Sequence, residues 1–242
     1  MSTQPENRDA AGWAQRVDRL TVADGHINVT GRRPTAPMQG FGRMWQKTYR
    51  TALTGVDSSP SEAITAWKEH FPEFWPAGNR FFAPLAGIQP GEVAALSLSM
   101  PGGLKLSTGV LVLYADDESF TLMTPQGHMF AGWITFSAFV EDGVTCAQAQ
   151  VLMRASDPLY ELGMTFGGHR KEDAHWSHTL SALAAHLGAA GEVVAETVCV
   201  DRKRQWSRAG NVWHNSGVRS ALHTAGAPFR ALTRPFRRHR AA

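Results

Sequence analysis

The distribution of apolar and polar residues divides the chain into short alternating segments and two helical ones. Residues 43–55 alternate, with Trp45, Tyr49 and Leu53 on one parity, which is typical of a half-buried strand. Similar runs bounded by turn-forming residues predict strands at 92–100, 107–115, 119–124, 133–140 and 144–155. The connections between these runs are short, which favours an antiparallel meander, because parallel strands need long crossovers.

Two helices are predicted on either side of this meander. The run Ser-Pro-Ser-Glu at 59–62 combines a hydroxyl cap, a proline at the first helical position and a glutamate that can reach back to the cap. This helix is expected to end near Phe71. The second helix is predicted over 170–187, where four apolar residues recur at helical spacing: Trp176, Leu180, Leu183 and Leu187.

The order strand, helix, meander, long helix predicts an α+β fold, a curved antiparallel sheet wrapped around a long C-terminal helix over an apolar cavity. On the strand 144–155, one parity carries the small and apolar residues Ala147, Ala149, Val151 and Met153, which suit a cavity wall. Arg154 lies on the other parity and is expected to point into water. We expect three parts. These are a flexible N-terminal arm (1–40), a ligand-binding domain (41–190), and a region (191–242) with an extra strand at 193–200 and a basic, partly disordered tail.

This order of elements, over 43–189, resembles the START-like or polyketide-cyclase-like helix-grip superfamily. The segment Thr124-Pro125-Gln126-Gly127-His128, followed by Gly132, is also similar to a Thr-x-Pro-Gly-His…Gly segment of a bacterial domain family of unknown function. It departs from that pattern at Gln126, which separates the proline from the glycine. The resemblance implies that the cavity accommodates an apolar small molecule or lipid, in some members with cyclase or dehydratase chemistry.

Composition and charge add limits to this interpretation. The chain has 242 residues, of which 43% are hydrophobic, so it can bury a sizeable core. Its net charge of +3 is uneven, because basic residues gather after Val200 while the rest is mildly acidic. The first residues are polar and contain no apolar leader, so a cytoplasmic location is expected, with peripheral membrane contact as an alternative. Two distant cysteines show no zinc spacing, and no cofactor or metal is expected.

The candidate ligand-binding residues are aromatic side chains on apolar parities: Tyr49, Trp67, Tyr114, Trp133, Phe136 and Trp176. His128 lies in a glycine-flanked turn, where an imidazole can transfer protons near neutral pH, and it is a weak catalytic candidate. The competing interpretation is a turn histidine that bonds a local carbonyl. His175 and His178, one helical turn apart, lack a third ligand and are interpreted as part of a solvated helix face with one or two half-buried histidines.

The basic tail leaves three interpretations open. Its aromatic residues are interleaved with four arginines, Arg230, Arg234, Arg237 and Arg238. The tail suits contact with an anionic membrane, contact with nucleic acid, which is less favoured, or a disordered solubilising role. The leading function is non-catalytic binding of a hydrophobic small molecule or lipid. The alternatives are a cyclase or dehydratase that uses a cavity histidine or tyrosine, and interaction through the tail.

Overall fold

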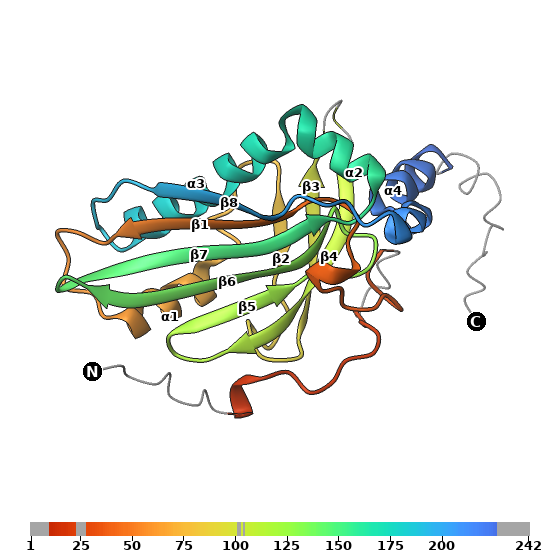
Figure 1. Ribbon diagram of the computed structural model, residues 1–242. Helices are drawn as coiled ribbons and strands as arrows, with labels where there is room; N and C mark the ends of the chain where they lie inside the picture. Colours follow the sequence, from red (N-terminus) through yellow and green to blue (C-terminus); the bar gives the residue numbers. More distant parts are fainter. Residues whose placement is uncertain (1–9, 23–27, 101–102, 104, 227–242) are drawn as a thin grey trace, which may run out of the picture.

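A computed structural model describes residues 10–22, 28–100, 103 and 105–226, and shows one curved antiparallel sheet of eight strands (Figure 1). The strands are β1 (Met44–Ala52), β2 (Arg80–Phe82), β3 (Val93–Ser99), β4 (Lys105–Ala115), β5 (Ser119–Met123), β6 (Phe130–Glu141), β7 (Val144–Ala155) and β8 (Val194–Asp201). Their order in the sheet is β2-β3-β4-β5-β6-β7-β1-β8. The predicted meander is confirmed. The short strand β2 lies in a proline- and aromatic-rich stretch that the sequence predicts only as a connection.

The helical elements are η1 (Ala10–Gly12), η2 (Pro37–Gln39), α1 (Pro60–His70), α2 (Pro158–Gly163), η4 (Met164–Gly168), α3 (His169–His186), η5 (Trp206–His214) and α4 (Ser216–Ala225). Helices α1 and α3 lie on the concave face of the sheet, and the other helical elements lie at its ends or against its convex face (Figure 1). The predicted cap of α1 is confirmed, since Glu62 N donates to Ser59 Oγ at 3.3 Å and Ser59 N donates to Glu62 Oε2 at 2.8 Å. No helix in the described ranges is long and apolar enough to cross a membrane.

The concave face of the sheet carries one large apolar core, to which both α1 and α3 contribute. Trp67 of α1 and Phe71 at its C-terminal cap pack against Phe120 of β5 and Phe136 of β6, and all four side chains are fully buried. Phe120 and Phe136 are stacked with their ring centroids 4.6 Å apart. A curved antiparallel sheet that grips a long helix is the helix-grip fold predicted from the order of elements.

The chain between β7 and α3 turns sharply at a kink. Asp157 caps α2, because its side chain accepts hydrogen bonds from the backbone N–H groups of Leu159 and Tyr160 at 2.9 and 3.0 Å. The helical path then breaks at Phe166 and Gly167, and Gly167 has a φ of +103° that favours glycine. The kink leaves Phe166 80% exposed. Neither α2 nor η4 is among the helices predicted from the sequence.

The sequence predicts a flexible arm over residues 1–40. The described residues of this segment lie against the convex face of the sheet. Leu20 and Val29 are buried in a second, small core with Leu111 of β4. Trp13 packs against Tyr114 with ring centroids 4.8 Å apart. Apolar contacts of this kind anchor a chain that has no regular hydrophobic period of its own.

After α3 the chain adds an edge strand and two further helical elements. The extra strand predicted at 193–200 is confirmed as β8, which pairs with β1. Residues beyond β8 cover Arg154, which lies on the convex face as expected but is fully buried rather than solvated. Its Nη1 donates to the carbonyl oxygens of Gly42 and Lys203 at 2.6 and 2.8 Å. The four tail arginines from Arg230 onward lie outside the described residues.

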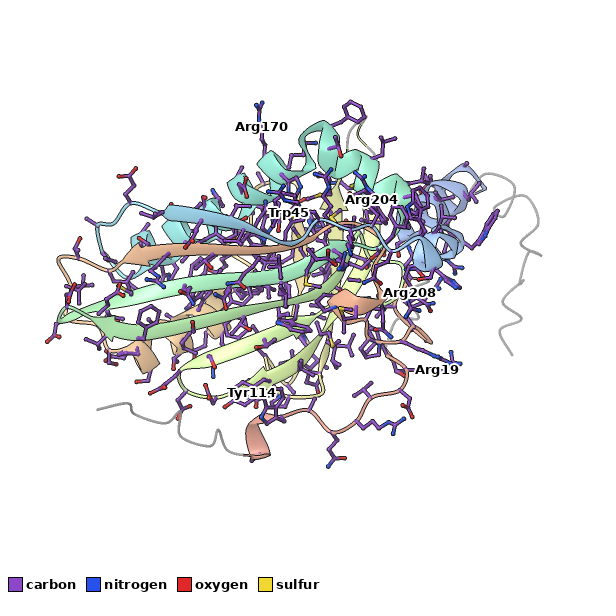
Figure 2. The ribbon with its side chains drawn as sticks, viewed as in Figure 1. Arg19, Trp45, Tyr114, Arg170, Arg204 and Arg208 are labelled. Atoms are coloured by element: carbon purple, nitrogen blue, oxygen red, sulfur yellow. The ribbon has the colours of Figure 1, made fainter. Side chains whose placement is uncertain are left out.

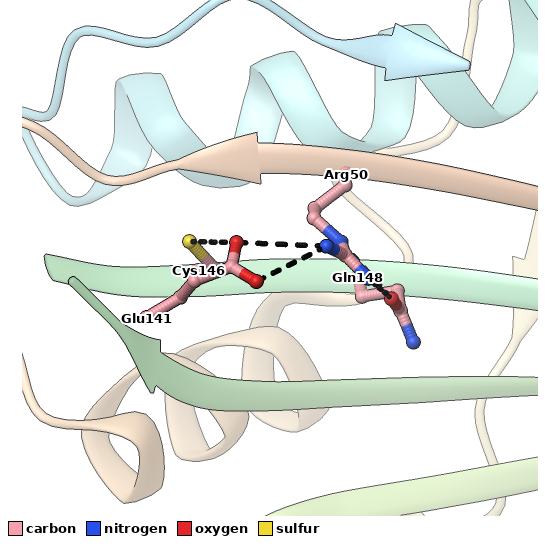
Figure 3. A network of polar contacts seen from close by, with 4 residues as sticks. All are labelled: Arg50, Glu141, Cys146 and Gln148. Atoms are coloured by element: carbon pink, nitrogen blue, oxygen red, sulfur yellow. Dashed lines mark hydrogen bonds and ion pairs between the residues drawn. The ribbon is translucent and has the colours of Figure 1, made fainter. Parts of the chain in front are cut away.

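Elsewhere the convex face of β7 and β1 carries polar side chains (Figure 3). Arg50 of β1 donates from Nε and Nη2 to Gln148 Oε1 at 3.1 and 2.8 Å, and it forms a 3.4 Å ion pair with Glu141. Cys146 lies at the end of this row, with its Sγ 4.0 Å from Glu141 Oε2. The alternation of apolar concave and polar convex positions therefore fixes the register of these strands.

Candidate functional site

The candidate site is a cavity between the concave face of the sheet and the segment from α2 to α3. Its volume is about 290 Å³. Its walls are largely apolar and include Leu98, Val110, Val151, Met153, Met164 and Trp176. The predicted cavity wall on β7 is therefore confirmed at Val151 and Met153, whereas Ala147 and Ala149 belong to the packed core.

The opening of the cavity can be placed from the lining residues that are exposed. Ser99 at the end of β3 is one of them, and Gly163, Phe166 and Lys171 on the opposite side are the others. The cavity therefore opens between the end of β3 and the kinked segment η4. Glycines at positions 163, 167 and 168 line this side without adding side-chain volume.

His128 lines the cavity from the turn between β5 and β6. The turn is held by Gly127, whose φ is +90° and whose carbonyl oxygen accepts a hydrogen bond from Ser216 N at 2.9 Å. His128 Nδ1 lies 3.0 Å from Phe130 N and 3.3 Å from Phe130 O, so this ring nitrogen is engaged with the local backbone. Burial lowers the pKa of His128 to about 4. The imidazole is therefore neutral at pH 7.

A buried charged cluster lies beside the cavity, where β1 passes under α3. Lys47 is 1% exposed and forms ion pairs with Glu172 Oε2 at 2.9 Å and with Asp173 Oδ1 at 2.7 Å. Tyr49 also donates to Asp173 Oδ1 at 2.7 Å. Burial raises the pKa of Glu172 to about 7, while Lys47 opposes this shift. Burial, with both carboxylates nearby, raises the pKa of Tyr49 above its ordinary range.

His175 lies one helical turn after Glu172, and both line the cavity. The amide of Asn79 is oriented by Ser99 N, which donates to Asn79 Oδ1 at 2.8 Å. The Asn79 Nδ2 group then faces His175 Nδ1 at 3.3 Å, so that Nδ1 accepts and the proton is on Nε2. Burial lowers the pKa of His175 to about 4. His175 is therefore a half-buried histidine on a helix face where His178 is exposed, which agrees with the interpretation from the sequence.

The six aromatic residues predicted to bind ligand lie in three different places in the structure: the cavity wall, the packed core and the convex face. Trp133 and Trp176 are among the lining residues, together with His128. Tyr49, Trp67 and Phe136 are fully buried in the packed core beside the cavity. Contact of these residues with a ligand stays a prediction.

Tyr114 is misplaced in the sequence interpretation, which puts it on the cavity side of its strand. The register between β4 and β5 shifts between Val112 and Tyr114, which pairs Tyr114 with Thr121. Thr121 lies on the face opposite Phe120, so the shift turns Tyr114 to the convex side. There it packs on Trp13 and donates to Asp116 Oδ2. Figure 2 shows it beside the N-terminal segment and far from α3.

Two charged residues of the site are missed by the sequence interpretation, although a signal for each is present. Lys47 shares the parity of Trp45 and Tyr49, so a cation stands on the buried face of its strand. Glu172 precedes Trp176 by four residues and thus extends the apolar stripe of the helix. Ionisable residues on buried stripes indicate paired charges or a functional site.

Comparisons with known proteins show likeness in fold at low identity. No protein-family model matches the chain, and no curated protein matches it. The aromatase/cyclase di-domain protein StfQ from the steffimycin biosynthetic pathway is 11% identical, covering 60% of this chain and 51% of that chain with a TM-score of 0.48. Protein Ms6760 from Mycobacterium smegmatis is 15% identical, with coverages of 60% and 91% and a TM-score of 0.43. A START superfamily protein from the same organism is 20% identical, with coverages of 61% and 98% and a TM-score of 0.39.

Proposed function

We propose that this protein binds a compact hydrophobic small molecule in the cavity under α3, without catalysing its conversion. The observation that carries this proposal is the cavity of about 290 Å³ beside a packed aromatic core. Natural cores have few voids larger than a water molecule, so a hollow of this size needs an explanation. Apolar walls with a few polar groups are typical of small-molecule sites.

The size of the cavity favours a compact ring system over a long-chain lipid. Small-molecule sites usually have volumes of roughly 300–1,000 Å³, and this cavity, at about 290 Å³, lies just below the lower end of that range. Its aromatic walls, Trp75 and Trp176, meet edge to face with ring centroids 6.4 Å apart. Such walls suit a flat apolar molecule, which can stack against them.

The cavity histidines are poorly suited to act as general bases, whereas Glu172, with a pKa raised to about 7, is the lining residue on which a catalytic alternative would rest. A general base works best when its pKa lies near the operating pH, whereas burial lowers the pKa values of His128 and His175 to about 4. Tyr160, a lining residue, has a pKa raised by burial, and its oxygen accepts a hydrogen bond from Gly217 N at 2.9 Å. These groups are suited to orient a ligand by neutral hydrogen bonds.

Uptake of an environment-sensitive apolar dye tests this function. We expect wild-type protein to bind the dye and Leu98→Trp, which adds volume inside the wall, to bind it at least tenfold more weakly, on the order of 1.4 kcal/mol. Leu85→Trp makes the same change at a fully exposed position and should bind like the wild type. If the wild type takes up no dye, or if both variants bind it as the wild type does, the cavity is not a binding site.

Contact with an anionic membrane is a second candidate, and η5 favours it. Trp206 and Trp213 are 73% and 83% exposed, although tryptophan usually seeks burial or a membrane interface. Arg204 and Arg208 lie two residues before and after Trp206 in the sequence, toward the end of the molecule that carries α2 and α4 (Figures 1 and 2), and Arg204 forms an ion pair with Glu161 Oε1 at 2.9 Å. Arginine and tryptophan together suit the headgroup region of an anionic bilayer.

Vesicle co-sedimentation separates this candidate from nucleic-acid binding. We expect the full chain to sediment with phosphatidylserine-containing vesicles at low salt and less at high salt, because exposed charges are screened. Replacing both tryptophans by serine should reduce sedimentation more than Leu85→Ser. Equal sedimentation of both variants, or a DNA mobility shift without vesicle binding, would contradict a membrane role for η5.

A further inference from the structure

Two polar groups that face the cavity have unmet hydrogen-bonding capacity. Glu172 is 7% exposed, and its Oε1 accepts no hydrogen bond within the described part of the chain. His175 Nε2 is buried and likewise has no partner among the described residues. Buried polar atoms in native proteins are nearly always paired, so these two indicate a partner that the protein chain does not supply.

The two groups lie close together and have opposite roles. They are three residues apart on α3, a spacing that places side chains about 5–6 Å apart on one helix face. The contact with Asn79 leaves the His175 proton on Nε2, which makes that atom a donor. Lys47 holds the other carboxylate oxygen, Oε2, at 2.9 Å, so Oε1 of Glu172 is left as an acceptor.

We propose that the cavity selects an apolar molecule carrying a hydroxyl group, an alcohol or a phenol, which donates to Glu172 Oε1 and accepts from His175 Nε2. A hydroxyl is the smallest group that donates and accepts through one oxygen. The apolar remainder of the molecule lies against Leu98, Val151 and Trp176. This inference rests on the proposed function, because it names the chemical class of the ligand in the same cavity.

Other ligand classes satisfy the pair less well. A hydrocarbon leaves both groups unpaired, and an ether or ketone satisfies His175 alone. A carboxylate ligand would stand next to the Glu172 carboxylate, and like charges in a buried site repel. The site therefore discriminates by a donor and an acceptor that must be satisfied together, which is a strong basis for specificity.

Three naphthalenes of similar size test the inference by competition with the apolar dye. These probes are 2-naphthol, which donates and accepts, 2-methoxynaphthalene, which only accepts, and 2-methylnaphthalene, which does neither. At pH 8, above the Glu172 pKa of about 7, wild-type protein should bind 2-naphthol about tenfold more tightly than 2-methylnaphthalene. The methoxy compound should lie between them, about threefold above the methyl compound.

Variants test which side chain causes each difference in affinity between the three naphthalenes. His175→Phe keeps the ring beside Trp75 and Trp176 but removes the donor, so the methoxy and methyl compounds should become equal. Glu172→Met should abolish the preference for 2-naphthol over the methoxy compound, and Glu172→Gln should retain part of it. His178→Phe, on the same helix but exposed and outside the cavity, is the matched control and should change nothing.

The outcomes are distinct. Equal binding of all three probes to the wild type, or dye uptake that none of them displaces, overturns the hydroxyl inference and leaves the proposed function intact. Absence of dye uptake overturns both. Should Glu172→Met fail to fold, the order of the wild-type affinities and the effect of His175→Phe still decide the question.

Discussion

The two halves of the concave face differ in how they are filled, although they share one sheet and one long helix. Under α1, Trp67 and Phe71 interlock with Phe120 and Phe136, and every ring is fully buried. Under the start of α3, the glycine-rich kink around Gly167 supplies little side-chain volume, and a cavity remains. The hollow therefore comes from small residues in the covering segment, because the sheet is lined by apolar residues in both halves.

The packed half is expected to contribute more to stability than the hollow half. In a closely packed region each buried atom gains dispersion energy from contacts on all sides, whereas atoms that line a cavity lack contacts on one side. The charged cluster of Lys47, Glu172 and Asp173 lies beside the hollow half. Polar groups are thus placed where a ligand can reach them.

The largest expected difference comes from removing a tryptophan on each side. Trp67→Ala should lower the free energy of unfolding by about 3–5 kcal/mol, because a fully buried ring leaves a cavity behind. Trp176→Ala, at a half-buried lining position, should cost only about 1–2 kcal/mol. Urea denaturation of both variants measures the difference. Equal losses would show that the two halves are equally packed.

A finer comparison uses neighbouring positions on the concave face of β7. Ala149→Val inserts volume into the packed core and should destabilise the protein by about 1–3 kcal/mol. Val151→Ile adds a methylene at the cavity wall and should be neutral or stabilise by up to about 0.8 kcal/mol. Thermal unfolding distinguishes the two. If Val151→Ile destabilises as strongly as Ala149→Val, the wall is not hollow at this position.

A pH dependence of stability is expected from Glu172. Burial raises its pKa from 4.5 to about 7, so between these values the folded state binds more protons than the unfolded state. The contribution of Glu172 to stability is therefore present below pH 4.5 and is lost as pH rises to about 7. His128 and His175, with pKa values lowered from 6.5 to about 4, contribute a slope of opposite sign.

The contribution of Glu172 is obtained as the difference in unfolding free energy between the wild type and Glu172→Gln. Glu172→Gln keeps the histidine slopes and removes only the carboxyl titration. The stability of the wild type relative to this variant should fall between pH 4.5 and 7, as measured by urea denaturation at several pH values. A difference that stays constant over this range would contradict the raised pKa.

The sequence predicts the elements well because their signals are local. The alternation around Val144–Ala155, the cap at Ser59 and the stripe ending at Leu187 each depend on residues within a few positions of one another. These patterns establish the meander, the two main helices and the extra strand β8. Local signals of this kind survive in the fold because burial of one face enforces them.

The site is predicted less well, because its geometry depends on features that are not local. A single shift of register before Tyr114 moves that side chain to the opposite face, and no residue type marks the shift. Arg154 is buried by a segment that follows it by about fifty residues. Lys47 and Glu172 show their burial in the pattern, but their pairing needs the packing of α3 on β1. Tertiary contacts decide these cases.

The packing of the N-terminal segment also has a consequence for the order of synthesis. Asn28 is fully buried and donates from Nδ2 to Ser216 O and Ser220 Oγ, which follow it by 188 and 192 residues. Ribosomes add roughly 5–20 residues per second, so these partners are synthesised on the order of ten seconds or more after Asn28. The convex face can therefore close around Asn28 only after α4 has been synthesised.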